Sequence, residues 1–411
     1  MEESSVSPII NFVDASVKAL CVTNWDTDGD GELSEAEAAA VIDLGTAFCW
    51  NSRITSFDEL KYFTGLRCIN SQAFMGCTSL ASVTIPDGVA SIEHAAFHSC
   101  KNLSTITIPN GVIVIGDEAF SQCSGLTSVL IPNSVTTIDY LAFYDCSGLT
   151  SIDIPNSVTS IGETAFERCS ALTSVNISSN VSFIGDGAFS MCVNLANISV
   201  DAMNQYYDSR NNCNAIIDTR TSTLIVGCKN SVIPEGVTSI GNLAFFYCRG
   251  LTSIDIPNSV TSIGSSSFNE CRGLTSITIP DSMISIGENA FLNCTGLAVI
   301  NMSDNLEYIG KDAFRETAWY ENQADGLIYA GKVAYRYKGT MPDNTAISLK
   351  EGTLGIAGAA FLFCAGLISI TIPSSVTNIG NEAFEYCKNL VSVSIPNSVI
   401  TIGDRAFRSC I

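Results

Sequence analysis

Apolar and polar residues follow one repeating pattern over most of the chain. The repeat unit reads Leu-Thr-Ser-Ile-x-Ile-Pro-x-Ser-Val-Thr-x-Ile-Gly-x-x-Ala-Phe-x-x-Cys, as in Leu251 to Cys271. A fixed period of this length is typical of proteins built from stacked structural repeats. The phenylalanine of the unit recurs every 23 residues in three runs, at Phe74, Phe97, Phe120, Phe143, Phe166 and Phe189, at Phe245, Phe268, Phe291 and Phe314, and at Phe361, Phe384 and Phe407.

Each unit predicts two short extended segments and a tight turn. Leu251, Ile254 and Ile256 alternate with polar residues, which is the period of a strand with one buried face, and Pro257 ends that strand. Ile263 lies in a second extended segment, and Ala-Phe-x-x-Cys predicts a helical or 3₁₀ turn with Phe and Cys inside. One unit cannot cover its own apolar side chains. Successive units must therefore stack as coils at roughly 4.8 Å, joined by parallel strands.

Cysteines follow the same period. Twelve of the seventeen lie three residues after a repeat phenylalanine, which predicts an inward column of reduced thiols rather than a disulfide framework. Two of the other five, Cys213 and Cys228, bracket a predicted hairpin in an insertion at about residues 200–233. The spacing leaves open either a disulfide between them or two free thiols.

A second insertion, at about residues 316–350, gathers aromatic and basic residues in an otherwise acidic chain. Gly331-Lys332 predicts a two-residue hairpin turn within it. Because aromatic and arginine side chains dominate binding hot spots, this hairpin is a predicted partner-binding site. The alternative is that its rings pack the hairpin onto the coils beneath. The predicted binding residues are Trp319, Tyr320, Tyr329, Lys332, Tyr335, Arg336 and Tyr337.

The net charge excludes several functions. Asp and Glu number 41 against 20 Lys and Arg, a net charge of −21, and such a field repels nucleic-acid phosphates and anionic membranes. No apolar run of about 18 residues predicts a transmembrane segment. With only His94 and His98, and without a phosphate-binding glycine loop or a nucleophile elbow, we predict that the protein is not an enzyme. A glycosidase based on a carboxylate pair is a remote alternative.

One segment before the repeats matches a known metal-binding motif. Residues 26–37, which we call the acidic loop, match the twelve-residue EF-hand loop at every position. Glu32 would contribute its backbone carbonyl and Glu37 both carboxylate oxygens. The alternative is an acidic turn that caps the following helix. The predicted ligands of one Ca²⁺ are Asp26, Asp28, Asp30, Glu32, Ser34 and Glu37.

EF-hand loops usually pair through the residue at loop position eight, which predicts a partner loop further along the chain. Residues 47–58 align as a degenerate second loop with Ile54 opposite Leu33, but Ala47 and Cys49 stand at ligand positions. A helix is predicted over residues 57–63. Residues 1–65 are therefore predicted to form an EF-hand-like helical cap over the first coil, and residues 66–411 the repeats.

The repeat unit closely resembles the BspA-type leucine-rich repeats of surface proteins from anaerobic gut and oral bacteria. The acidic loop resembles that of EF-hand and dockerin-like calcium modules. The resemblance covers about residues 66–411. It departs from the family pattern between Cys192 and Phe245, at Thr317, where the cysteine is missing, and at Asp139 and Ala357, where the glycine is missing. It implies an α/β repeat solenoid, namely a right-handed leucine-rich repeat solenoid of 23-residue coils with a parallel β-sheet. The small α-helical cap precedes it.

The resemblance also implies an extracellular or cell-surface location, with any signal or anchor segment outside these 411 residues. The predicted function is non-enzymatic, adhesin-like binding of a macromolecular partner, either protein or glycan. The alternative is an envelope spacer or a polysaccharide-binding element. Outward strand positions, such as Thr84, Thr107, Leu130, Asp153 and Asn176, predict a flat and mostly polar face. The open edge of the C-terminal coil predicts either a continuing chain or end-to-end self-association.

Overall fold

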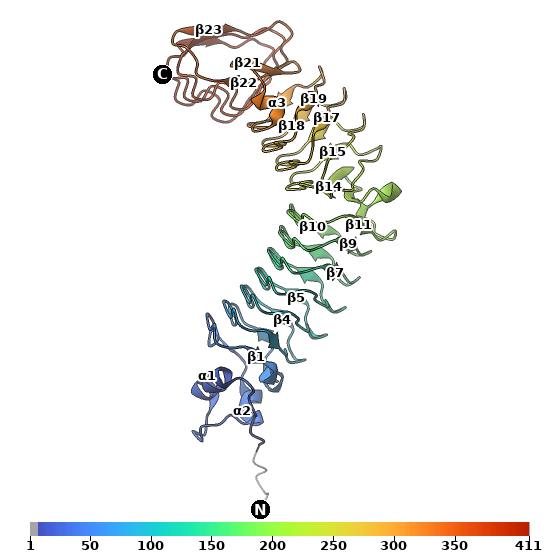
Figure 1. Cartoon of the computed structure of the whole chain (residues 1–411), viewed down its shortest axis with the longest axis vertical. Helices are drawn as coiled ribbons and strands as arrows, with labels where there is room; N and C mark the ends of the chain where they lie inside the picture. Colours follow the sequence, from blue (N-terminus) through green and yellow to red (C-terminus); the bar gives the residue numbers. More distant parts are fainter. Residues whose placement is uncertain (1–6, 411) are drawn as a thin grey trace, which may run out of the picture. The chain divides into compact units, whose positions relative to one another are not determined.

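The computed structural model describes residues 7–410. The chain divides into two compact units, Met1–Asp208 and Ser209–Ile411, each built from stacked coils (Figure 1). Parallel strands of neighbouring coils pair residues that are 23 apart, as Ser91 pairs with Val114 and Val114 with Thr137. This register confirms the predicted solenoid of 23-residue coils with parallel sheets.

Unit 1 begins with helices and continues as coils. The helices are α1 (Ala15–Trp25), α2 (Glu35–Ala40) and the 3₁₀ helix η1 (Asp58–Tyr62). The predicted helix over residues 57–63 is wrong in type and length, because β1 (Ser56–Phe57) already pairs in parallel with β3 (Ser82–Val83) of the next coil. That pairing leaves room for only a short 3₁₀ helix.

The second extended segment of each coil forms the longest sheet of unit 1. Its order is β10-β8-β6-β5-β4-β2, whereas the first extended segment pairs only in shorter sheets, β1-β3 and β11-β9-β7. The longer sheet consists of β2 (Cys68–Ile69), β4 (Ser91–Ile92), β5 (Val114–Ile115), β6 (Thr137–Ile138), β8 (Ser160–Ile161) and β10 (Phe183–Ile184). The three-stranded sheet consists of β7 (Ser151–Asp153), β9 (Ser174–Ile177) and β11 (Asn197–Val200), and β12 (Tyr207–Asp208) belongs to neither sheet.

Unit 2 repeats this arrangement around two antiparallel hairpins. The first hairpin is formed by β13 (Ala215–Asp218) and β14 (Thr223–Gly227), and the second by β21 (Gly326–Ala330) and β22 (Val333–Lys338). Each hairpin is continued by parallel strands of the following coils. The remaining elements are η2 (Arg210–Asn212), β15 (Ser239–Ile240), β16 (Ser262–Ile263), β17 (Ser276–Thr278), β18 (Ser285–Ile286), β19 (Val299–Asn301), β20 (Tyr308–Ile309), α3 (Ala318–Glu321), β23 (Thr345–Ser348), β24 (Gly355–Ile356), β25 (Leu367–Thr371), β26 (Asn378–Ile379), β27 (Ser392–Ser394) and β28 (Thr401–Ile402).

One predicted strand of unit 2 does not form. Leu251 to Ile256 alternate in burial as expected, yet they are not a strand. The corresponding stretch of the preceding coil, residues 229–233, is not a strand either, and β17 of the next coil pairs with β19 instead.

The turn that carries each phenylalanine is not helical, contrary to the prediction. In the coil of Phe120, Glu118 and Gln122 have left-handed φ values of 55° and 59°, which interrupt a helix. Amide groups of the turn therefore alternate between their own coil and the next. Ser121 N–H donates to the Glu118 carbonyl, whereas Phe120 N–H donates to the carbonyl of Ala142 in the next coil.

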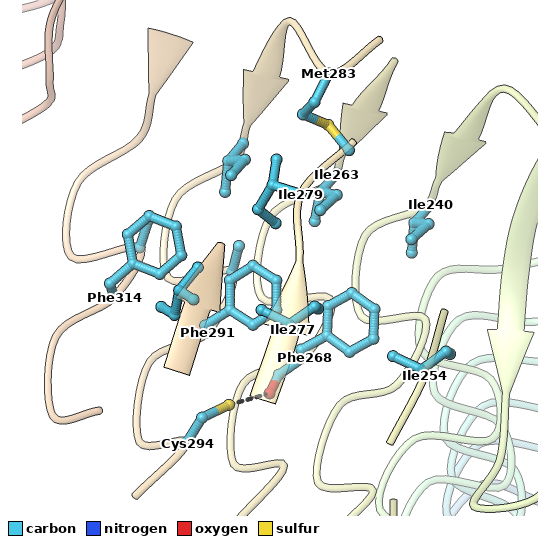
Figure 2. Packing of buried hydrophobic residues seen from close by; sticks show 14 of the residues in the cluster. Ile240, Ile254, Ile263, Phe268, Ile277, Ile279, Met283, Phe291, Cys294 and Phe314 are labelled. Atoms are coloured by element: carbon cyan, nitrogen blue, oxygen red, sulfur yellow. Dashed lines mark hydrogen bonds between the residues drawn. The ribbon is translucent and has the colours of Figure 1, made fainter. Parts of the chain in front are cut away.

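The phenylalanine rings form stacked columns: one runs from Phe74 to Phe189 in unit 1, and two run from Phe245 to Phe314 and from Phe361 to Phe407 in unit 2. In unit 1, the centroids of successive rings lie 5.1–5.3 Å apart from Phe74 to Phe189, with nearly parallel planes. In unit 2, Figure 2 shows the rings of Phe268, Phe291 and Phe314 side by side, with isoleucines of the strands around them. Burial of these rings is a main apolar contribution to stability.

The cysteines form a second column beside the rings. The Cys294 thiol donates to the carbonyl oxygen of Phe268 at 3.0 Å, drawn as a dashed line in Figure 2, and the same contact recurs from coil to coil. Burial raises the pKa of Cys294 to about 12. All these thiols are free, which confirms the predicted reduced column, and Cys213 and Cys228 are also buried free thiols.

Candidate functional site

The acidic loop connects α1 to α2 near the N-terminal end of unit 1 (Figure 1). One carboxylate oxygen from each of Asp26, Asp28 and Asp30 lies within 4.8 Å of the others. The Asp26 carboxylate also accepts hydrogen bonds from the backbone N–H groups of Gly29 and Gly31, at 2.7 and 3.0 Å. Both glycines have positive φ, so the backbone bends tightly around the carboxylates.

Glu37 ties together the two ends of this loop. Its Oε1 accepts from the backbone N–H and the hydroxyl of Thr27, both at 2.8 Å. Its Oε2 accepts from the backbone N–H and hydroxyl of Ser34, both at 2.9 Å. The backbone hydrogen bonds from Ser34 and Thr27 are the main cause that lowers the pKa of Glu37 to about 2. Thr27 was not singled out from the sequence, because its position carries no ligand in the EF-hand pattern.

The remaining predicted ligands lie on the same loop. The Glu32 carboxylate is paired with Lys18 of α1 at 2.6 Å, so only its backbone carbonyl is a candidate ligand, as expected. Ser34 is the N-cap of α2 and forms a capping box with Glu37. The loop therefore caps α2, and it also holds the carboxylates of Asp26, Asp28 and Asp30 close together.

The predicted degenerate second loop is wrong. The fully buried Leu33 accepts a backbone hydrogen bond from Ile10 N–H at 2.9 Å, so the acidic loop pairs with the segment before α1 and not with Ile54. Residues 47–58 instead belong to a coil. Phe48 stacks on Phe74 at 5.2 Å, and the Cys77 thiol donates to the Phe48 carbonyl at 3.0 Å. The spacing from Phe48 to Phe74 is 26 residues, so the 23-residue period does not reveal this coil.

The aromatic hairpin, residues 319–338, directs its main rings inward. Tyr335 is 1% exposed, accepts a hydrogen bond from Phe314 N–H at 2.9 Å and meets the Phe314 ring edge to face. Tyr320 is also buried, and Trp319, Tyr329 and Tyr337 are half-buried.

The charges of the aromatic hairpin are also engaged. Arg336 forms an ion pair with Asp312. Lys332 is exposed and lies 3.8 Å from Asp304. The seven predicted binding residues are therefore close in space, but mostly as a packing contact between the hairpin and the coil below it.

The missing cysteine of the repeat explains where this insertion begins. Thr317 stands in the cysteine position, is fully buried, and donates to the Phe314 carbonyl at 2.7 Å. The same hydroxyl accepts from Tyr320 N–H at 3.0 Å and so caps α3. A hydroxyl, unlike a thiol, starts a helix well, and the chain leaves the coil pattern there.

An open groove of about 500 Å³ lies on the polar strand face of unit 1. It is lined by the Ile-Pro-Asn turns of two successive coils, by Thr107 and Leu130 just before these turns, and by residues of the two flanking coils. Leu130 is 72% exposed within it. From the sequence, this leucine is one of the outward strand positions of a mostly polar face. The flanking coils contribute Asp87, Asp153 and Pro155.

The coil at the C-terminal end leaves apolar side chains in solvent. Val391, Ile400 and Ile402 are exposed by 84%, 81% and 51%. The self-association expected from this edge stays a prediction.

The stacked coils with an inward cysteine column define a leucine-rich repeat solenoid. The chain belongs to the family described as the BspA type leucine rich repeat region. The family profile, which describes a region of six repeat copies, matches over residues 46–146, 91–217, 225–324 and 334–411.

A solved structure supports this fold. A leucine-rich repeat protein from Eubacterium ventriosum is 24% identical, with a TM-score of 0.52, over 81% of this chain and 83% of that one. A leucine rich cell surface protein from Faecalibacterium prausnitzii is 27% identical, with a TM-score of 0.43, over 86% and 82% of the two chains. No curated protein gives a significant match. Among the helices described within residues 7–410, none has the length and apolar character needed to cross a bilayer.

Proposed function

We propose that this protein is a non-enzymatic, exported or cell-surface scaffold that binds another protein. The observation that carries the proposal is the difference between the inward and the outward side chains of each coil. The apolar rings and the thiols are buried in the core. The strand positions that face solvent carry small polar side chains, and the groove at Leu130 lies on the same face. Membership of the BspA-type family supports the surface location.

The positions of the aromatic rings favour a protein partner over a glycan. Sugar-binding surfaces commonly offer exposed rings, whereas Tyr320 and Tyr335 of the aromatic hairpin are buried. An envelope spacer or polysaccharide-binding element is the alternative function that the same fold would allow.

The test is a binding screen with the whole chain. The chain would be immobilised and probed with arrays of purified extracellular proteins and of polysaccharides, and each polysaccharide would be checked for chain shortening. We expect saturable binding to at least one folded protein. Binding confined to polysaccharides would support the alternative, and shortening of any glycan would contradict a non-enzymatic role.

We further propose that the acidic loop binds one Ca²⁺ and thereby stiffens the helical cap. Carboxylate and carbonyl oxygens are the ligands that Ca²⁺ prefers, and three carboxylates held within 4.8 Å repel one another unless a cation lies among them. Glu37 joins both ends of the loop and would complete the site. The ligands would be Asp26, Asp28, Asp30, the Glu32 carbonyl, Ser34 and Glu37.

Calorimetric titration and thermal melting would test calcium binding. We expect one site whose occupancy raises Tm by mass action, lost in the Asp28→Ala, Glu37→Ala double variant. Glu35→Gln is the matched control, because it removes a charge from the same helix turn without touching the predicted ligands. If the wild-type chain takes up no Ca²⁺, the loop is only a helix cap.

A further inference from the structure

We propose that the groove around Leu130 binds an extended peptide segment that carries an apolar side chain between two basic ones. This inference rests on the proposed protein-binding function and names its site and the chemistry of its partner.

Leu130 is the apolar exception in a polar row. The equivalent positions of neighbouring coils are Thr84, Thr107, Asp153 and Asn176, and Leu130 bridges in parallel to Thr107. Its side chain is 72% exposed although its neighbours show that a polar residue fits this position. Folding therefore does not require the leucine, and an exposed apolar group inside a groove is suited to contact with a partner.

The groove has an apolar floor without aromatic rings. Ile108 and Ile131 are buried beneath it, as are Pro109 and Pro132. A floor of proline and isoleucine accommodates an aliphatic side chain, whereas it offers no ring for a sugar to stack on. Asn110 and Asn133, one from each turn, supply amide groups at the rim for a peptide backbone.

The ends of the groove are acidic. Asp87 and Asp153 are exposed, and neither forms an ion pair with any residue in the described part of the chain. They lie on coils three steps apart, so their separation along the stack is roughly 15 Å at about 4.8 Å per coil. Leu130 lies on a coil between them. These free carboxylates favour a partner with two positive charges at a similar spacing.

An extended peptide matches this spacing. Side chains i, i+2 and i+4 of an extended chain point to the same side, and i to i+4 spans about 13 Å. A segment of the form basic-x-apolar-x-basic would therefore place its apolar side chain against Leu130 and a Lys or Arg near each of Asp87 and Asp153. Side-chain length supplies the remaining reach.

The probe for this proposal is a fluorescein-labelled peptide, Ser-Lys-Ser-Leu-Ser-Lys-Ser, titrated with the whole chain in fluorescence anisotropy. We expect saturable binding that weakens with added salt, because the end contacts are ionic. The peptide with Glu in place of both Lys should not bind. The peptide with Ser in place of Leu should bind at least about fivefold more weakly.

Variants of the chain give the decisive comparison. Asp87→Asn with Asp153→Asn should weaken binding about tenfold or more, and Leu130→Ser should weaken it severalfold. The matched control is Asp281→Asn with Asp255→Asn, because these aspartates occupy the same two coil positions in unit 2 and carry the same charge. The control should bind the peptide as the wild type does.

Three results would overturn the proposal: no saturable binding, equal weakening in both aspartate pairs, or no effect of Leu130→Ser. Equal weakening would mean diffuse attraction to an acidic protein. The proposed function is tested separately with the protein partner found on the array. If that partner binds the groove variants as well as the wild type, the groove proposal fails while the protein-binding function stands.

Discussion

Single residues of the repeat each have a contact that explains their type. Phe268 lies between Phe245 and Phe291 with centroid distances of 4.9 and 5.0 Å. The repeat glycine permits close approach of coils, since a Cβ added at Gly287 would lie 2.6 Å from the backbone nitrogen of Ser265. At this scale, the consequences of substitution follow from burial and close contact.

Replacing Phe268 by alanine should destabilise the protein by about 3–5 kcal/mol, because the ring is fully buried and its loss leaves a cavity between two other rings. Urea denaturation of the variant would measure the free energy of unfolding. The control is Phe363→Ala, whose ring is 66% exposed and whose loss should cost below about 1 kcal/mol. Similar costs for the two variants would contradict a ring column in the core.

Glu37 should make the stability of α2 depend on pH. Its pKa is lowered from 4.5 to about 2, mainly by hydrogen bonds from the backbone N–H groups of Ser34 and Thr27. A carboxyl whose folded-state pKa is lowered stabilises the fold above its unfolded value, and this contribution is lost as pH falls toward 2. Amide exchange in α2, measured in steps from pH 5 to pH 2 without Ca²⁺, should therefore accelerate relative to the intrinsic rate.

The Glu37→Gln variant is the control for this pH dependence, since it keeps the side-chain shape but cannot ionise. Its protection in α2 should be lower at pH 5 and should change less on acidification. An equal acid response in both proteins would assign the effect to other carboxyls.

At the scale of elements, departures from the repeat are held by contacts that the pattern does not contain. The short helix α3 has few backbone hydrogen bonds of its own, and Lys338 of β22 completes it. The Lys338 ammonium donates to the carbonyls of Tyr320, Glu321 and Gln323, at 3.1, 2.7 and 2.9 Å. The hairpin thus docks by capping the end of the helix that precedes it.

Replacing Lys338 by methionine should cost about 1–3 kcal/mol, because three carbonyls lose a charged donor whose side chain is only 18% exposed. The change would be read as the midpoint of denaturation. Lys332→Met in the same hairpin removes an exposed ammonium and should have almost no effect. A larger loss for Lys332→Met than for Lys338→Met would contradict the capping role.

On the scale of the whole molecule, stability is distributed along two stacks of coils. Each coil contacts mainly its neighbours, so a defect should spread to adjacent coils and fade with distance. The chain divides into the units Met1–Asp208 and Ser209–Ile411, with one column of rings in the first and two in the second.

Phe268→Ala should therefore accelerate amide exchange at coils near residue 268, including the Phe245 amide, and leave the Phe120 amide of unit 1 unchanged. Hydrogen exchange with peptide-level mass spectrometry would show this. Phe120→Ala should accelerate amide exchange at coils near residue 120 and leave the Phe245 amide of unit 2 unchanged. Uniform acceleration through both units would instead mean that the chain unfolds as one cooperative body.

The coil architecture could be derived from the sequence because it depends on residue types at a fixed spacing. The inward positions of Phe268 and Cys294 and the parallel register all follow from that period. The oxygen-rich composition of the acidic loop was likewise visible at Asp26, Asp28 and Asp30. Coils with another spacing could not be predicted from the period, and the coil around Phe48 is an example.

The amino-acid sequence by itself therefore determined the repeat, the family and the chemistry available in each coil, since these are properties of local patterns. Only the tertiary structure decided which distant segments meet. It paired Leu33 with Ile10 rather than with Ile54, and it turned Tyr335 into the core. It also placed Leu130 in a groove between two acidic coils. Such contacts depend on which backbone groups and surfaces remain unpaired after the coils have stacked, and no short-range pattern records that.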